Sequence, residues 1–249
     1  MGNFSSQKYS GHMKKKFFFI AALFLSPIAW NDLAVTPPII QFENDDKFSE
    51  ITIKNTNKSP RIFDVSVQQW LQKNGLDEYE KTDDIIAMPI TVIVEPESEK
   101  IIRIISKNKP KEAAQNSYRL FIRENPYKAA EKTTQGVAFK FLYRIVVPIF
   151  SYGKNHTSTE KLSWSAVQDS KSEKIKVTLN NLGTKATLLN GIGIKGISNT
   201  NFSQARYVLP GAFYVWEFPI KQKKSFNKVD LQLKINEKPA EISIDLIKS

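Results

Sequence analysis

The feature that most constrains the fold of this chain is a run of alternating side chains over residues 137–150, which read VAFKFLYRIVVPIF. Side chains that alternate with a period of two predict a β-strand with two distinct faces. The large apolar residues of one face are Val137, Phe139, Phe141, Tyr143 and Ile145. One face can serve the core of the protein itself, whereas exposed rings on the other face would need a partner to cover them. We therefore interpret this strand as one that the protein lends to another molecule.

Short extended segments of the same kind recur along the chain between turn signals, which is typical of immunoglobulin-like β-sandwiches. The first series predicts strands at residues 33–42, 50–54, 61–71, 90–94, 100–105, 117–123 and 137–150. The second series predicts strands at residues 162–167, 174–180, 186–195, 207–208, 214–220, 229–235 and 241–247. The sequence thus predicts an all-β protein with two immunoglobulin-like β-sandwich domains, residues 30–152 and 161–249, and a linker over residues 153–160.

The composition excludes several classes of chemistry. The chain has no cysteine, which rules out disulfides, thiolate chemistry and cysteine-ligated zinc. Its formal net charge is +11, but no helix-turn-helix, zinc or ribonucleoprotein motif accompanies the charge, so we do not expect nucleic acid as a partner. We interpret the excess charge as a solvated basic surface that helps to attract an acidic partner.

The first 29 residues predict export from the cytoplasm. Lysines at 14–16 precede an apolar run over residues 17–25, and residues 26–29 read SPIA. This order is that of a secretory signal peptide, with residues 1–12 as an upstream extension and cleavage expected after Ala29. The apolar run is too short to span a bilayer comfortably. We therefore expect a periplasmic protein that does not insert into a membrane.

Several segments carry, in order, a resemblance to a known family. They read AVTPP at 34–38, IKNT at 53–56, VQQW at 67–70, TDDIIAMP at 82–89, VEP at 94–96, IIRI at 101–104, YRL at 118–120, YR at 143–144, VPIF at 147–150 and YVLPG at 207–211, followed by Trp216. Together, over about residues 33–247, they resemble the periplasmic chaperones of chaperone–usher pilus assembly, and most closely their archaic branch.

The resemblance implies a boomerang-shaped molecule with two immunoglobulin-like domains joined at an angle, without cofactor, metal or enzymatic activity. It implies a chaperone that binds, folds and caps pilus subunits by donor-strand complementation and delivers them to an outer-membrane usher. Each subunit is a sandwich that lacks one strand, and the chaperone fills the gap with a strand of its own. Whether the free protein hides this strand by self-association stays open.

Two sets of residues are candidates for the binding site that the resemblance implies. We expect Val137, Phe139, Phe141 and Tyr143 to enter the groove of the subunit; alternatively, these rings belong to the domain's own core and the other face is lent. We expect Arg144, Arg119 and, more weakly, Arg103 to anchor the terminal carboxylate of the subunit, because the planar guanidinium suits a carboxylate.

The arginine prediction depends on how the strands pair. An antiparallel pair that turns near residues 126–135 would bring Arg119 and Arg144 together, next to the linker. Other branches of the family use a basic residue near the start of the first strand, but residues 36–41 read TPPIIQ and contain none. We expect Arg119 to replace it, with an internal ion pair as the alternative role. Arg123 and Glu124 are expected to form a structural ion pair with each other.

The main alternative function is that of a secreted two-domain immunoglobulin-like adhesin or pilus subunit. Such a subunit would carry its own donor segment near the mature start, whereas the donor-like strand here is internal. An enzyme is not expected, because His156 is alone in the predicted linker and no serine nucleophile motif accompanies it. Asp83 and Asp84 are adjacent, so on a strand they would point apart, and we interpret them as a solvated turn.

Overall fold

The structure is a computed structural model that describes residues 32–43, 46–111, 115–126, 142–169, 173–197, 202–220 and 227–248. All of these residues belong to one compact unit, Asp32–Ser249, and their regular secondary structure consists of β-strands. The predicted signal peptide, residues 1–29, lies outside the described residues, as do Val137, Phe139 and Phe141.

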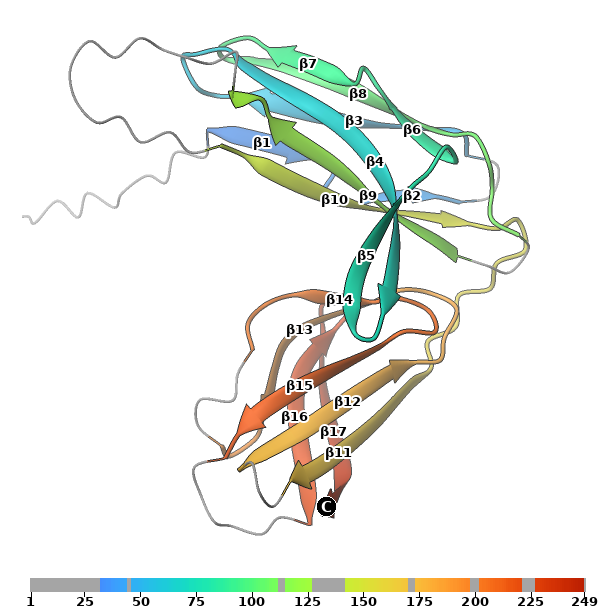
Figure 1. The fold of residues 1–249 in the computed structure, drawn as a ribbon, viewed down its shortest axis with the longest axis vertical. Helices are drawn as coiled ribbons and strands as arrows, with labels where there is room; N and C mark the ends of the chain where they lie inside the picture. Colours follow the sequence, from blue (N-terminus) through green and yellow to red (C-terminus); the bar gives the residue numbers. More distant parts are fainter. Residues whose placement is uncertain are drawn as a thin grey trace, which may run out of the picture. The chain divides into compact units, whose positions relative to one another are not determined.

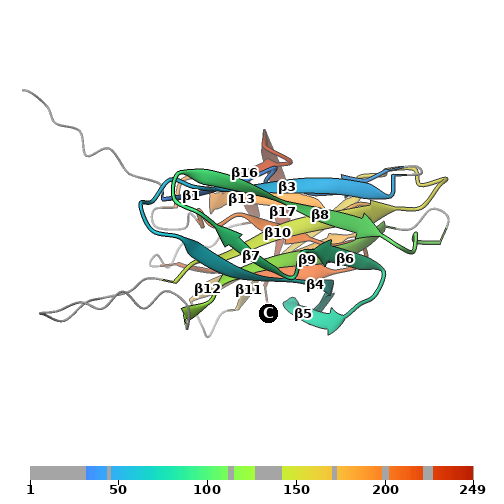
Figure 2. The same ribbon diagram turned by 90° about the horizontal axis from the view of Figure 1, so that it is seen from above.

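Strands β1–β10 form a first lobe of two sheets around one core (Figure 1). One sheet has the order β1-β3-β8-β6, and the other has the order β2-β10-β9-β4-β5, with β7 pairing beside β4. The strands are β1 (Leu33–Thr36), β2 (Ile40–Phe42), β3 (Phe48–Asn55), β4 (Arg61–Lys73), β5 (Leu76–Lys81), β6 (Ile85–Met88), β7 (Thr91–Val94), β8 (Ser98–Ser106), β9 (Gln115–Glu124) and β10 (Arg144–Tyr152). The long strands β3 and β8 run side by side, as Figure 2 shows from above.

The alternation of buried and exposed residues places the core of the first lobe between its sheets. In β3, Ile51 and Ile53 are buried, and in β8 Ile102 and Ile104 are buried, while the intervening residues face outward. Complete burial of such a side chain contributes roughly 1.5–3 kcal/mol. The period-two pattern in the sequence therefore fixes which face of each strand turns inward.

Strands β11–β17 form a second lobe. They are β11 (Leu162–Asp169), β12 (Lys174–Asn181), β13 (Thr187–Ile194), β14 (Arg206–Val208), β15 (Phe213–Pro219), β16 (Lys228–Ile235) and β17 (Lys238–Lys248). Their order is β14-β13-β16-β17-β11-β12-β15, in which β17 pairs first with β16 and then, at Leu246–Lys248, with β11. Both halves of this path contribute to one core that includes Val177, Trp216 and Leu231. The prediction of two sandwich-like lobes is confirmed.

Two strands of the first lobe are absent from the sequence prediction, namely β5 and β6. Every residue of β5 is exposed, so its sequence LDEYEK shows no alternation between apolar and polar residues. It forms a strand because β4 is long enough to extend beyond β9 and to pair with β5 from Gln68 to Lys73. The two-residue turn Asn74-Gly75, in which both residues have positive φ, folds β5 back onto β4.

Each lobe uses one buried asparagine at the end of a strand. The Asn55 side chain donates to the carbonyl oxygens of Ser59 (2.9 Å), Val94 (3.1 Å) and Glu95 (3.2 Å). In the second lobe, the Asn181 side chain donates in the same way to Lys185 (2.9 Å) and Val208 (2.8 Å). These side-chain amides donate hydrogen bonds to carbonyl groups both in the following loop and in a neighbouring segment, and so give these carbonyl oxygens a donor.

Replacement of Asn55 by alanine is expected to destabilise the protein by about 1–3 kcal/mol, because buried carbonyl groups lose their hydrogen-bond donor. Urea unfolding followed by tryptophan fluorescence would measure this change. Lys58→Ala, in the exposed part of the same turn, is the control and should shift the free energy of unfolding by less than about 0.5 kcal/mol. Equal stability of the two variants would contradict the structural role of Asn55.

Candidate functional site

The first half of β10 has an edge that no described strand occupies (Figure 1). On one side, β9 pairs with β10 in antiparallel fashion from Arg144 to Tyr152. On the other side, β2 pairs with it in parallel fashion only from Ile149 to Ser151. Within the described residues, the edge from Arg144 to Pro148 is therefore a template for an additional strand.

The backbone of β10 presents hydrogen-bonding groups along this edge. The Glu124 N–H donates to the Tyr143 carbonyl oxygen at 2.9 Å, so the backbone groups of Tyr143 face β9. Since successive residues direct their backbone groups to opposite sides of a strand, those of Arg144 and Val146 face the open edge. Pro148 lies on the same side, where its missing N–H breaks no bond to β9. The edge thus offers a short ladder that ends at Pro148.

The two faces of β10 have different environments. Tyr143 and Ile145 pack against the core of the first lobe, in line with the buried Val147 and Ile149. Tyr143, which we expected to enter a partner's groove, lies in this structure on the face that serves the protein's own core. The apolar residues on the outer face are Leu142, which is 48% exposed, and Val146, which is 37% exposed. In the described part of the strand, the face open to a partner is therefore the one with Leu142 and Val146, and not the one with Tyr143.

Arg119 of β9 lies on the outer face of the same sheet, against aromatic rings. Its guanidinium carbon is 3.5 Å from the ring centroid of Trp70 and 5.9 Å from that of Tyr207 in the second lobe. Its Nε is buried without a hydrogen-bond partner. Burial lowers the pKa of the Arg119 guanidinium, although the neighbouring Tyr79 and Asp77 oppose this shift. In the described part of the chain, the arginines that form ion pairs are Arg61 and Arg103.

The Arg119 guanidinium forms no ion pair among the described residues, but Tyr79 and Asp77 lie close enough to stabilise its charge. Withdrawal of a cation from water raises the free energy of the folded state, and neighbouring rings, the Tyr79 hydroxyl and the charge of Asp77 offset only part of this cost. The arriving carboxylate of a partner would therefore gain a strong charge-assisted bond. The alternative role of Arg119, an internal ion pair, has no counterpart among the described residues.

Arg144 lies on the same outer face as Arg119 but not beside it. The register of β9 and β10 pairs Arg119 with Pro148 and Arg144 with Arg123. The two positions are therefore four residues apart, or about 13 Å along the sheet. The prediction that the pairing brings Arg119 and Arg144 together is wrong in this respect, because it assumed a register that differs by several residues. Their strands are neighbours, but the two arginines are not cross-strand partners.

Arg103, the third predicted anchor, lies in the other sheet. It belongs to β8, pairs with Glu50 of β3 across the strands and forms an ion pair with that residue at 3.4 Å. Its side chain is 73% exposed. Arg103 is therefore separated from Arg119 by the core of the first lobe, and the structure gives it no place at the same site.

Glu124 forms its ion pair with Arg61, a residue that is absent from the sequence-based predictions of ion pairs. It is buried and accepts hydrogen bonds from Arg61 at 3.0 Å and from the Tyr143 N–H at 3.1 Å. The predicted ion pair between Arg123 and Glu124 is wrong, because adjacent residues of a strand point to opposite faces. Arg123 instead donates to the Ser66 hydroxyl at 3.2 Å on the outer face.

The residues that surround Arg119 are likewise absent from the sequence-based predictions of the site. Gln72 donates from Nε2 to the Tyr207 carbonyl oxygen at 2.9 Å, and its Oε1 accepts from the Leu209 N–H at 2.9 Å. These two bonds hold Tyr207 next to Trp70, with ring centroids 6.0 Å apart. Residues 67–70 and 207–211 are both among the segments that carry the family resemblance. Their position in the sequence does not show that they lie at one site, which only their contacts in the structure reveal.

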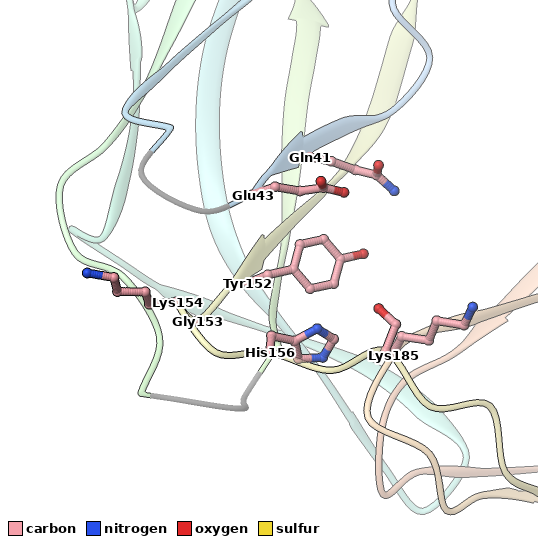
Figure 3. A pocket seen from close by; sticks show the side chains of 8 residues that line it. Gln41, Glu43, Tyr152, Gly153, Lys154, His156 and Lys185 are labelled. Carbon is pink, nitrogen blue, oxygen red and sulfur yellow. The ribbon is translucent and has the colours of Figure 1, made fainter.

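A separate cavity of about 300 Å³ lies near the carboxyl end of β10 and is shown in Figure 3. It is lined by Gln41, Glu43, Tyr152, Gly153, Lys154, His156, Ser158 and Lys185. The ring of His156 packs on Tyr152, and its Nε2 lies 2.9 Å from the Thr184 carbonyl oxygen. His156 thus contacts a ring and a backbone carbonyl, which gives no pairing of a base with a nucleophile.

The predicted acidic turn has a structural role. Asp84 accepts hydrogen bonds from the Asn108 side chain at 2.9 Å and from the Tyr118 hydroxyl at 3.2 Å. Burial, followed by the negative charge of Asp84, raises the pKa of Tyr118 to about 12. Among the residues that the structure describes, no group of three acidic or histidine side chains is arranged to hold a metal ion. None of the described residues forms a helix with the length and hydrophobicity to cross a membrane.

Comparison with known proteins identifies the relatives of this architecture. Residues 32–152 match the family model described as pili and flagellar-assembly chaperone, PapD N-terminal domain. No curated protein sequence gives a significant match.

Solved structures match over both lobes. A chain in the CsuC–CsuE chaperone–tip adhesion subunit pre-assembly complex of archaic Csu pili from Acinetobacter baumannii matches with a TM-score of 0.63 at 20% identity, over 87% of this chain and 99% of that chain. A chain in the Salmonella enterica complex of SafA pilin with the SafB chaperone matches with a TM-score of 0.59 at 12% identity, over 86% of this chain and 96% of that chain. The Pseudomonas aeruginosa CupB2 chaperone matches with a TM-score of 0.54 at 14% identity, over 85% of this chain and 98% of that chain. At these identities, the matches establish the fold.

Proposed function

Residues 32–152 belong to the pili and flagellar-assembly chaperone family, and from this premise we propose that the protein is a periplasmic chaperone that binds pilus subunits by donor-strand complementation. Two of the structurally similar proteins occur in complexes with a tip adhesion subunit and with a pilin. The family consists of assembly chaperones, which supports a binding protein in preference to an enzyme. The observation that carries the proposal is the open edge of β10 next to Arg119, a partly buried arginine that forms no ion pair among the described residues.

The open edge supplies both components of strand donation. A subunit that lacks one strand exposes unpaired backbone groups and an apolar groove, and an added strand satisfies both. The backbone groups of Arg144 and Val146 pair with the subunit, while Leu142 and Val146 offer apolar surface on the outer face. Val137, Phe139 and Phe141 lie in the segment that immediately precedes this edge, and we propose that the segment extends the donated strand.

The position of Arg119 sets the direction of the bound subunit strand. Arg119 lies at the level of Pro148, and β2 already occupies the edge of β10 from Ile149 onward. A subunit strand whose terminal carboxylate reaches Arg119 can therefore extend only past Val146 and Arg144. It must run in the same direction as β10. We propose Arg119 as the carboxylate anchor, enclosed by Trp70 and Tyr207, and do not retain Arg103.

The remaining steps follow from the family. We propose that the segment at residues 1–29 directs export to the periplasm, that residues 30–152 form the subunit-binding domain, and that residues 161–249 form the second domain after a linker. An outer-membrane usher would receive the complex. No cofactor is needed, because the free energy of strand addition comes from backbone pairing and apolar burial.

The proposed function is tested by removing one backbone donor from the open edge. Val146→Pro deletes an N–H on the side where Pro148 already shows that a proline is accommodated, so the pairing with β9 is retained. We expect this variant to lose most of its capture of pilus subunits encoded beside it when the proteins are co-expressed and purified together. Val146→Thr, which keeps the N–H and favours a strand, should capture normally. Wild-type capture by a folded Val146→Pro variant would refute strand donation at this edge.

A further inference from the structure

Arg144 and Arg123 form a pair of like charges directly opposite each other on neighbouring strands. The Glu124–Tyr143 backbone bond makes the next pair, Arg123 and Arg144, a non-hydrogen-bonded pair, in which side chains approach most closely. Both guanidinium groups lie over the ring of Phe121, at 4.5 Å for Arg123 and 5.4 Å for Arg144. Like charges at opposing positions destabilise a sheet, and the ring offsets only part of this effect.

The row of side chains across the sheet contains one acidic residue, and it is engaged elsewhere. Asp64 of β4 lies opposite Arg123. Its carboxylate accepts hydrogen bonds from the Thr91 hydroxyl at 3.2 Å and from the Asn125 side chain at 2.8 Å. Among the described residues, neither Arg123 nor Arg144 forms an ion pair. The row therefore ends at the open edge with a cation, Arg144, that has no acidic neighbour there.

Strand addition at the open edge changes the environment of this cation. The subunit strand places one side chain beside Arg144 on the same face of the extended sheet. The subunit also covers Leu142 and Val146 on either side of Arg144 and reduces its contact with water. A guanidinium that loses water is stabilised only by an anion or by hydrogen bonds. A neutral neighbour would leave two adjacent cations without compensation.

We propose that this protein selects subunits with an acidic side chain next to Arg144 in their last strand, about four to six residues before the terminal carboxylate. This inference rests on the proposed function, because Arg119 fixes the carboxyl end of the strand at the level of Pro148. Arg144 lies four residues earlier along β10. Residues at even spacing share one face of a strand, so the acid lies on the same face as the anchor.

The test uses synthetic peptides that mimic the last strand of a subunit. Two fluorescein-labelled peptides of twelve alternating Val and Thr residues end in a free carboxylate and carry either Glu or Gln at both positions, four and six residues before the end. Fluorescence anisotropy with the full exported chain should give about tenfold tighter binding for the Glu peptide, the size of one charge-assisted contact. The preference should disappear in Arg144→Gln and should weaken as salt is added.

Arg103→Gln is the matched control, since Arg103 is an exposed arginine of the same lobe in the other sheet. It should keep the preference for Glu. Equal binding of both peptides to the wild type, or an undiminished preference in Arg144→Gln, would overturn the inference. A Gln peptide with an amidated carboxyl end distinguishes the carboxylate anchor at Arg119 from the selection at Arg144. If it binds as well as the Gln peptide with a free carboxyl end, the proposal of a carboxylate anchor is wrong. Binding of neither peptide would overturn both the anchor and the selection.

Discussion

Replacement of Arg119 by alanine is expected to reduce the affinity for a pilus subunit by about 10- to 150-fold. A hydrogen bond to a charged group contributes about 1.5–3 kcal/mol, and this range corresponds to that change in affinity. Arg119 is positioned for such a bond because Trp70 and Tyr207 hold its guanidinium, and it forms no ion pair with a described carboxylate. Isothermal titration of a purified subunit, kept soluble by a peptide that it can exchange, measures the change.

Two further variants test whether the loss of affinity in Arg119→Ala comes from the guanidinium group of Arg119. Arg119→Lys keeps the positive charge but loses the planar fork and its stacking on Trp70, so it should restore only a small part of the affinity. Arg103→Ala, in the other sheet, should bind as the wild type does. A subunit with an amidated carboxyl end should bind all variants with similar, reduced affinity. Unchanged binding by Arg119→Ala would assign the anchor to another residue.

Replacement of Arg61 by leucine is expected to destabilise the first lobe by about 3–5 kcal/mol. The Glu124 side chain is 2% exposed, and Arg61 contacts it at 3.0 Å. Removal of the arginine leaves a buried carboxylate without its counter-charge. Arg61 also lies over the ring of Tyr143, 4.8 Å from its centroid, so the entry to β10 should loosen as well. Urea unfolding monitored by circular dichroism would detect the loss.

The double variant Arg61→Leu with Glu124→Leu is the informative comparison. Replacement of both charges by apolar residues should recover most of the stability, since a buried ion pair gives little net stabilisation over a well-packed apolar pair. Hydrogen exchange at the amide of Tyr143, whose N–H donates to Glu124, should become faster in the single variant. If the single variant is as stable as the wild type, Glu124 is solvated in solution.

The sequence predicts the strands whose residues alternate and fails where pairing alone creates a strand. The buried isoleucines of β3 and β8 follow a period of two, so these strands could be predicted. In β5, exposed charged residues give no such signal, and its strand conformation depends on β4. The Asn74-Gly75 turn between the two strands is a local hairpin signal, but LDEYEK lacks the alternation that identifies the other strands.

The candidate site could be predicted only in part, for a similar reason. The chemistry of arginine and the resemblance to the family direct attention to Arg119 and Arg144. However, their separation depends on the register of β9 and β10, and alternation cannot fix a register to within four residues. Likewise, a strand with two apolar faces does not indicate which face is buried, so the sequence leaves open whether Tyr143 enters a partner's groove or the domain's own core, against which it packs in this structure. The ring of Tyr207 reaches Arg119 from 88 residues further along the chain.

The meeting of β2 with β10 beyond Pro148 has a consequence for fidelity. Because that part of the edge is already occupied, an incoming strand meets a fixed stop and cannot slide toward the carboxyl end of β10. Sliding by one residue would turn every side chain to the opposite face. In the proposed complex, β2 would therefore set the alignment of the subunit strand independently of its side chains, and additional residues of that strand would extend past Arg144 at the other end of the edge.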